Sequence, residues 1–329
     1  MQRWFLMVVL LSLFVVQTGK FAQAQQLSGD VLEEFRAEMQ DFFKFTSSIL
    51  ITFTSQTGVT QGNFVFSSDI DEDYSLKVFK APLRYYLVPA ENRLRPFVTL
   101  SYGHARTSVT YRSADYYPED LDVRDRDRSR TNSFGVKTGA SWEYRPGFTL
   151  EPFLGVAYSH IEYLYEFNTR FMREIIELFP ELDRDAYNTT VDLYSVSSGL
   201  RHSLDYPLGP GLFGFDLQYV YQYSRPWRSK SSFVDFSAHS SFLGTTLDYE
   251  LPTGLNLLDR ELSIKPFVSR TDLFGDFNKG MHLHHFYEFG MNLILDVGPF
   301  RNLFSRISLG GSYITGENFQ GWKFGLTFI

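Results

Sequence analysis

The chain has 329 residues, a length that allows two globular domains without requiring them. Its 38 acidic and 31 basic residues give a formal charge of −7, which argues against a nucleic-acid-binding protein, because such proteins usually present a basic face. The absence of cysteine excludes a disulfide scaffold, a cysteine-ligated zinc site, a cysteine nucleophile and a lipidated N-terminal cysteine. Aromatic residues make up 17% of the chain, yet its mean hydropathy is −0.19, which indicates segments where apolar and polar residues alternate.

The first 24 residues have the features of a secretory signal peptide. Arg3 supplies the positive charge, residues 4–16 form an apolar run, and residues 22–24 fit the small-x-small rule, so we expect a cut before Gln25. The apolar run is shorter than the roughly 20 residues of a membrane-spanning helix, which disfavours the alternative of an N-terminal anchor. No later stretch is typical of a membrane helix, so the exported chain is either soluble or an outer-membrane barrel.

After the signal peptide, apolar and polar residues alternate with a period of two, which is typical of β-strands. In residues 213–224 every odd position is apolar or aromatic, whereas only one even position is apolar; residues 283–297 show a similar pattern. A soluble sandwich alternates too. The long segments, the Gly- and Ser-rich polar face and the aromatic residues near segment ends favour a transmembrane barrel.

This register predicts which side chains face lipid and which face the lumen. The side chains expected to face lipid are Phe215, Tyr219, Tyr221, Leu293 and Leu295. Those expected to face the lumen are Lys137, Arg201, Asp216, Gln218, Glu288, Asn292 and Arg306. A slip of one residue in the register would exchange the two faces, so each assignment can be tested directly.

The alternation predicts twelve strands, an even number that suits a barrel with both chain ends in the periplasm. The segments lie near 47–55, 74–88, 95–111, 133–145, 148–164, 190–205, 211–224, 232–250, 260–271, 282–297, 303–315 and 320–329. The early odd-numbered loops, such as 112–132 and 165–189, are long and charged, whereas even-numbered loops such as 146–147 are short and carry Pro or Gly. Long outer loops and short periplasmic turns are the usual asymmetry of outer-membrane barrels.

Residues 30–44 break the alternation and predict one helix, for which Asp30 followed by Glu33 is a plausible cap. Its apolar face consists of Leu32, Phe35, Met39, Phe42 and Phe43. Fifteen residues make a rod of about 22 Å, which a barrel of twelve strands is wide enough to hold. We expect this helix to plug the lumen. Its acidic residues Glu33, Glu34, Glu38 and Asp41 would then meet the inward charges Lys137, Arg201 and Arg306. The alternative, a helix on the periplasmic membrane surface, is disfavoured by this acidic polar face.

The last strand segment carries a further signal. Trp322, Phe324, Leu326 and Phe328 share one face of a strand that also contains Gly325. This pattern is similar to the assembly signal of outer-membrane barrels. The sequence departs from that signal at Ile329, where an aromatic residue is usual.

The order of a signal peptide (1–24), a helix (25–45) and a twelve-strand barrel (46–329) resembles the translocator domain of autotransporters. Only residues 25–29 separate the predicted cut from the helix, so the chain resembles the solitary autotransporter-like β-domains, which have no passenger. The resemblance implies an all-β membrane protein, an antiparallel transmembrane barrel in the cell outer membrane. We expect a monomer, with outer-membrane lipids, lipopolysaccharide, the barrel assembly machinery and periplasmic chaperones as partners.

No motif predicts a catalytic residue, a cofactor or a metal site. The densest cluster is His282, His284, His285 and Glu288, but its spacing fits no zinc pattern, and polar lumen or interface residues are the simpler interpretation. The His-Ser neighbours at 202–203 and 239–241 are not dyads within a strand, because adjacent side chains point to opposite faces.

Two loops offer further candidate surfaces. Residues 115–130 are either a solvated charged loop or a site for lipopolysaccharide phosphates or divalent ions, and residues 167–179 predict a short helix. The leading hypothesis is a non-enzymatic barrel that acts as a restricted pore or a structural component. The alternatives are a barrel enzyme acting on lipid or peptide, and a surface adhesin or receptor that uses loops 112–132 and 165–189.

Overall fold

The structure is a computed structural model that describes most of the chain beyond the predicted signal peptide. The described residues are 33, 36–37, 39–44, 46–47, 58–67, 73–112, 124–178, 180–228, 231–257, 260–276, 278, 283–300 and 304–328. The predicted signal peptide, its cleavage site and Phe35 lie outside these ranges. In the described part of the chain, no helix has the length and apolar character needed to cross a membrane.

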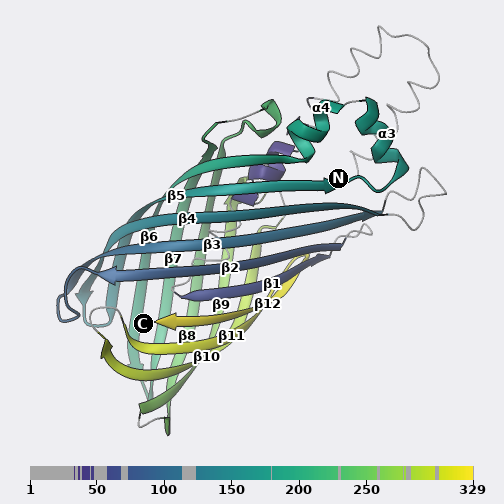
Figure 1. Cartoon of the computed structure of the whole chain (residues 1–329). Coiled ribbons are helices and arrows are strands. Elements are labelled where there is room, and N and C mark those ends of the chain that lie inside the picture. The colour runs from purple at the N-terminus through teal and green to yellow at the C-terminus, as the bar shows by residue number, and fades with distance from the viewer. Residues whose placement is uncertain are drawn as a thin grey trace.

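Within the described residues, twelve antiparallel strands form a closed barrel in which neighbours in the chain are neighbours in the sheet (Figure 1). The strands are β1 (Val59–Ser67), β2 (Asp73–Tyr86), β3 (Leu94–Arg112), β4 (Arg124–Arg145), β5 (Phe148–Glu166), β6 (Thr189–Leu208), β7 (Gly211–Pro226), β8 (Ala238–Leu257), β9 (Arg260–Gly275), β10 (His285–Phe300), β11 (Phe304–Gly316) and β12 (Phe319–Phe328). The predicted antiparallel barrel and its strand number are confirmed.

The first and last strands close the barrel. β1 pairs with β12 from Val59 opposite Leu326 to Phe66 opposite Phe319, and its other edge pairs with β2. A bilayer offers no water to an unpaired backbone N–H or C=O group, so a sheet crosses a membrane only when both of its edges are paired.

Side chains alternate between the outer and inner walls. On β10, Leu293 is 42% exposed on the outer wall, whereas its neighbour Ile294 is 2% exposed on the inner wall. Tyr219 and Tyr221 of β7 are exposed on the outer wall, and Glu288 of β10 is buried on the inner one. The strand period puts Phe215 and Leu295 on the outer wall and Asp216, Gln218 and Asn292 on the inner wall.

Aromatic side chains border the outer wall at both ends. One band lies toward the long loops and contains Tyr102, Phe134, Tyr158 and Tyr194. The other lies toward the short turns, where the ring centroid of Tyr144 is 5.8 Å from those of both Trp142 and Phe148. On β4, Phe134 and Trp142 are eight residues apart, which is about 26 Å along a strand and suits a tilted crossing of the apolar core.

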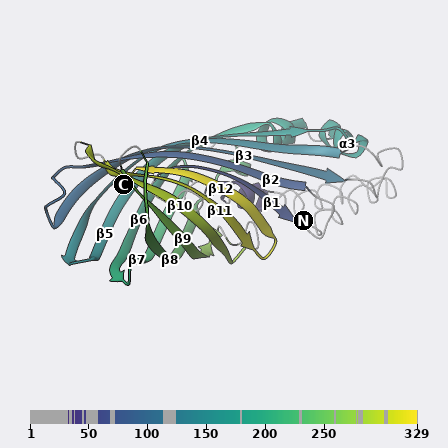
Figure 2. The same ribbon diagram turned by 90° about the horizontal axis from the view of Figure 1, so that it is seen from below.

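The wall is uneven in height. Strands β3, β4, β5 and β6 have 19, 22, 19 and 20 residues, whereas β1 has 9 and β12 has 10. The long strands project beyond the rest of the barrel toward α3 (Arg170–Leu178), as the view from below shows (Figure 2). One side of the barrel therefore stands higher than the seam where β1 and β12 meet.

Two predicted loops contain strand residues. Residues 56–73, which the prediction leaves as the loop after the first strand, contain β1, and of the predicted strand 47–55 only Ser47 is described and it is helical. In β1 the polar Gln61 and Asn63 face outward beside the apolar Val65, while Phe64 is buried inside, so the alternation is mixed and the segment resembles a loop. The predicted loop 112–132 contains the beginning of β4, where outward arginines alternate with inward aspartates and hydropathy gives no strand signal.

Short helices cluster at the long-loop end. The β5–β6 connection contains α3, as the spacing of residues 167–179 predicts, followed by α4 (Pro180–Leu182) and the π-helix η2 (Asp183–Tyr187). A 3-10 turn, η3 (Ser232–Val234), lies between β7 and β8. The described residues between 33 and 47 are all helical, which confirms the predicted N-terminal helix.

The register makes a direct prediction. Leu293→Arg puts a cation on the outer wall within the apolar band, at a cost of about 2–4 kcal/mol, whereas Asn292→Arg puts the same cation on the inner wall. We expect Leu293→Arg to lower the fraction of barrel that resists unfolding in unboiled gel samples, and Asn292→Arg to lower it less. Equal losses in the two variants would contradict the assignment of faces.

Candidate functional site in the barrel lumen

The N-terminal helix packs against the inner wall near the long-loop end. Phe43 is fully buried, and its ring centroid lies 5.7 Å from that of Tyr163 on β5 and 6.1 Å from that of Phe236. The ring of Phe42 lies 5.1 Å from that of Tyr163, and Met39 is buried in the same cluster. Tyr163 is an inward-facing residue, because its neighbour Leu164 is exposed on the outer wall.

Residues from the loops also pack around the helix. The buried cluster around Met39 and Phe43 also contains Ile161, Leu182, Ala186, Tyr187, Val191, Leu193, Phe233, Val234 and Ala238. These residues come from β5, β6, the start of β8 and the short helices α4, η2 and η3, so the helix lies between the inner wall and the long-loop connections.

Hydrogen bonds fix the position of the helix along the lumen. The Gln40 side-chain amide donates to the carbonyl oxygens of Ser232 and Asp235, both at 2.9 Å. The Gln222 amide on the inner wall of β7 donates to the carbonyl oxygen of Ser47 at 3.4 Å. Polar contacts therefore hold the helix at Gln40, in the middle of its described part, and at Ser47, its last described residue.

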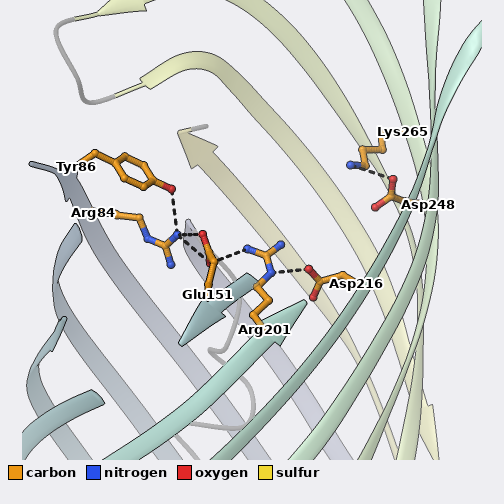
Figure 3. A network of polar contacts seen from close by, with 7 residues as sticks. All are labelled: Arg84, Tyr86, Glu151, Arg201, Asp216, Asp248 and Lys265. Carbon is orange, nitrogen blue, oxygen red and sulfur yellow. Dashed lines mark hydrogen bonds and ion pairs between the residues drawn. The ribbon is translucent and has the colours of Figure 1, made fainter. Parts of the chain in front are cut away.

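Nearer the short turns, charged side chains from four strands meet inside the barrel (Figure 3). The guanidinium of Arg84 on β2 donates to both carboxylate oxygens of Glu151 on β5, at 3.2 and 3.3 Å. Arg201 on β6 lies 3.8 Å from the same carboxylate and also bonds Asp216 on β7. Arg84 further donates to the Tyr86 hydroxyl at 3.2 Å. These side chains form a row of alternating positive and negative charges across the lumen, which we call the lumen network.

Glu151 is the centre of this network, and it is 5% exposed. β2 and β5 are not adjacent in the sheet, so the Arg84–Glu151 contact passes over β3 and β4. Gly139 on β4 makes this close approach possible. A Cβ atom there would lie 2.4 Å from the Pro152 carbonyl oxygen and 2.8 Å from the Phe97 ring, over which the Arg84 guanidinium stacks at 4.2 Å.

The other inward charges are also held by opposite charges or rings. Lys265 lies 3.0 Å from Asp248, and Arg306 bonds Glu250. Lys323 on β12 bonds the buried Glu288 on β10, which also accepts a hydrogen bond from Ser312 at 2.7 Å.

Glu34 and Glu38, two of the four acidic helix residues predicted to meet the inward charges, lie outside the described residues. Lys137 lies 4.5 Å above the Phe153 ring, and Arg201 and Arg306 pair with carboxylates of the wall. Asp41 bonds Lys44 of its own helix at 2.8 Å. The described part of the helix is therefore seated by aromatic packing and amide hydrogen bonds, while the charges of the wall pair with one another.

Sequence reasoning missed Arg84, Glu151, Gln40 and Gln222. Leu150 and Pro152 flank Glu151 in an ordinary alternating strand, and nothing local distinguishes it from a solvated carboxylate. Its importance comes from register, which puts Arg201 directly opposite it, and from barrel curvature, which brings Arg84 of β2 to the same carboxylate.

The histidine cluster gathers around a loop carboxylate. His284 and His285 lie 3.3 and 3.9 Å from Glu317, in the turn between β11 and β12, and His282 falls outside the described residues. Among the described residues there is no group of three or more metal-ligating side chains.

The last strand carries the predicted assembly residues. Trp322 and Phe324 are exposed on the outer wall, and Gly325 and Leu326 pair with Thr60 and Val59 across the seam. Phe328 pairs with Ile307 of β11. Their part in assembly stays a prediction.

Removing the central carboxylate tests the lumen network. Glu151→Gln leaves two cations facing each other across the lumen, and breaking a buried pair costs about 3 kcal/mol. We expect a lower urea midpoint for unfolding in detergent, followed by gel mobility. The exposed Glu177→Gln on α3 is the charge-matched control. Replacing Arg84 by Met together with Glu151 by Leu should recover most of the loss, and equal midpoints for Glu151→Gln and the control would contradict a structural network.

Comparison with known proteins identifies the fold and the family. The chain is similar to the transport unit of the autotransporter AIDA-I from Escherichia coli (TM-score 0.54, 10% identity, 88% of this chain and 99% of that chain covered). It is also similar to the translocator domain of NalP from Neisseria meningitidis (TM-score 0.53, 10% identity, 89% and 95% covered). A third match is the β domain of the Bordetella autotransporter BrkA (TM-score 0.51, 11% identity, 82% and 98% covered).

At these identities the likeness shows the fold alone. No curated protein matches the chain. The family model described as "Solitary outer membrane autotransporter beta-barrel domain" matches residues 54–328, which is nearly the whole barrel. The chain therefore belongs to the solitary outer-membrane autotransporter β-barrel family, and it is a barrel of the outer membrane.

Proposed function

We propose that this barrel is a non-enzymatic, restricted pore that the N-terminal helix plugs. The observation that carries the proposal is the seat of the helix, which buries Phe43 fully against Tyr163 and Phe236. A 15-residue helix alone in water is marginal, so it needs such a surface to remain folded. Its contacts with the inner wall give it that surface.

The lower lumen supports the same function. The lumen network joins β2, β5, β6 and β7 with alternating charges, and a cavity of about 120 Å³ remains beside Lys80, Lys137 and Gln218. Such a cavity has room for about four water molecules, at about 30 Å³ each. A barrel with a helix packed in its long-loop end and paired charges nearer its short turns passes small ions slowly and excludes larger solutes.

The helix contacts define how the plug would be released. Gln40 bonds the η3 connection and Phe43 fills the aromatic cluster, so both anchor the helix to the long-loop end. Displacement of the helix therefore requires the η2 and η3 connections to move with it or to lose these contacts. The solved barrels of similar fold include one described as a transport unit, and this chain would share that scaffold.

Deleting residues 25–44 tests the plug. We expect the single-channel conductance of the reconstituted barrel to rise severalfold, because the aromatic cluster loses its central filler, while the barrel still assembles. Phe43→Ser is the matching point variant, and it should increase the frequency of high-conductance openings. Ala37→Ser on the exposed side of the helix is its control. Unchanged conductance after the deletion would mean that the helix is not the plug, and turnover of labelled lipid or peptide by the wild type would favour the enzyme alternative.

A further inference from the structure

The outer wall of β2–β6 carries an apolar groove. The groove has a volume of about 680 Å³. One cross-strand row of its lining consists of Leu83, Leu100, Val136, Val156 and Val196, each opposite the next on successive strands. Such branched and aliphatic side chains, on a wall that faces lipid, offer a fitted surface for hydrocarbon chains.

Aromatic residues end the groove toward the long loops. The next cross-strand row contains Tyr102, Phe134, Tyr158 and Tyr194, which also line the groove. The Tyr102 hydroxyl donates to Asn132 at 3.0 Å, and the Tyr158 hydroxyl donates to Asp192 at 2.6 Å. These hydroxyls point to polar side chains one row farther out, which marks the boundary between acyl chains and headgroups.

A row of cations lies beyond this boundary. Lys77, Arg106 and Arg130 are directly opposite one another on β2, β3 and β4, and all three are exposed on the outer wall. Arg106 is four residues beyond Tyr102, about 13 Å along the strand, and strand tilt shortens this distance along the membrane normal. Long cationic side chains extend back toward the interface from such a position.

This cation row carries a net positive charge among the described residues. Like charges directly opposite in a sheet destabilise it, so three in one row are costly. Among the described residues, no carboxylate lies within ion-pair distance of Lys77, Arg106 or Arg130. Glu162 stands opposite Arg130 and offsets one of the three positive charges, although its nearest partner is His160 at 3.7 Å, and Glu166 pairs with Arg128, so the row keeps a net positive charge. An anion from outside the chain would balance the row.

We propose that this face binds a phosphorylated glycolipid of the outer leaflet, of the lipid A type. Its phosphates lie on Lys77, Arg106 and Arg130, and its acyl chains lie in the apolar groove below them. Arginine binds phosphate oxygens in a two-pronged geometry, and two arginines beside one lysine suit a headgroup with more than one phosphate. The apolar groove selects an amphiphile over a free anion. This site is separate from the lumen, so it does not depend on the proposed plug.

The test measures binding of lipid A to the full-length barrel in detergent micelles. The triple variant K77Q/R106Q/R130Q should bind lipid A carrying two phosphates about 100-fold more weakly, because each surface cation contributes roughly a factor of five to the attraction of an anionic headgroup. The matched control R93Q/R145Q/R260Q removes the same charge from exposed positions at the short-turn end and should leave binding unchanged. Equal affinities for the two triple variants would overturn the proposal.

Two further experiments separate the contribution of the apolar groove to binding from that of the cations. Val156→Trp fills the groove without touching the cations, and it should weaken lipid A binding while leaving binding of inorganic phosphate as it was. Inorganic phosphate that binds the wild type as tightly as lipid A would show an anion site only and overturn the glycolipid assignment. If the triple variant folds poorly, Arg106→Gln alone should still lower the affinity about fivefold. Without lipid A, the triple variant should unfold at the same temperature as the wild type or a higher one, because like charges have been removed.

Discussion

Pairing of every backbone polar group is the constraint on which this structure depends. In a bilayer each unpaired N–H or C=O costs several kcal/mol, so the twelve strands hold together only because β1 and β12 complete the ring. Closure also fixes the register all the way round. That register then decides which side chains face lipid, which pairs of charges meet inside and which cations stand side by side outside.

The inner wall has to accommodate the polar half of each alternating strand. Charges there are partly shielded from water, and an isolated one would be costly. In the described structure these charges form ion pairs between different strands, such as Lys323 with Glu288 and Lys265 with Asp248. The lumen network extends this to four strands, and Gly139 leaves the space that it needs. The aromatic rings of the helix fill the space near the long loops. Aromatic packing therefore fills that end of the lumen, whereas ion pairs cross it nearer the short turns.

The sequence predicts the barrel well because alternation is a local property of each strand. β7 and β10 show it plainly, and their outer and inner residues follow from the period alone. β1 was missed because Gln61 and Asn63 face outward and Phe64 faces inward, so only part of the strand follows the rule that apolar residues face lipid. The start of β4 was missed because its alternation is between opposite charges, and hydropathy does not distinguish Arg126 from Asp127.

The network around Glu151 lay beyond sequence reasoning for another reason. Its members Arg84, Arg201 and Asp216 are 67, 50 and 65 residues away in the chain; strand pairing puts Arg201 directly opposite Glu151, and the curvature of the closed sheet brings Arg84 to it across β3 and β4. The seat of the helix is similar, since Gln40 meets backbone carbonyls nearly 200 residues later. Local pattern gives the elements, whereas long-range contacts depend on how the ring closes.

The uneven strand lengths have a consequence for the surrounding membrane. A transmembrane strand needs about 9–11 residues, so β1 and β12, with 9 and 10, are barely long enough to cross at the seam. Hydrophobic mismatch makes lipids compress beside a short apolar wall. The polar Gln61 and Asn63 narrow the apolar band at the seam further, whereas the extra length of β4 beyond Phe134 is charged and lies outside the apolar band. Lipids along β1 therefore meet less apolar wall than lipids beside the groove, and we expect the bilayer to be thinnest along the seam.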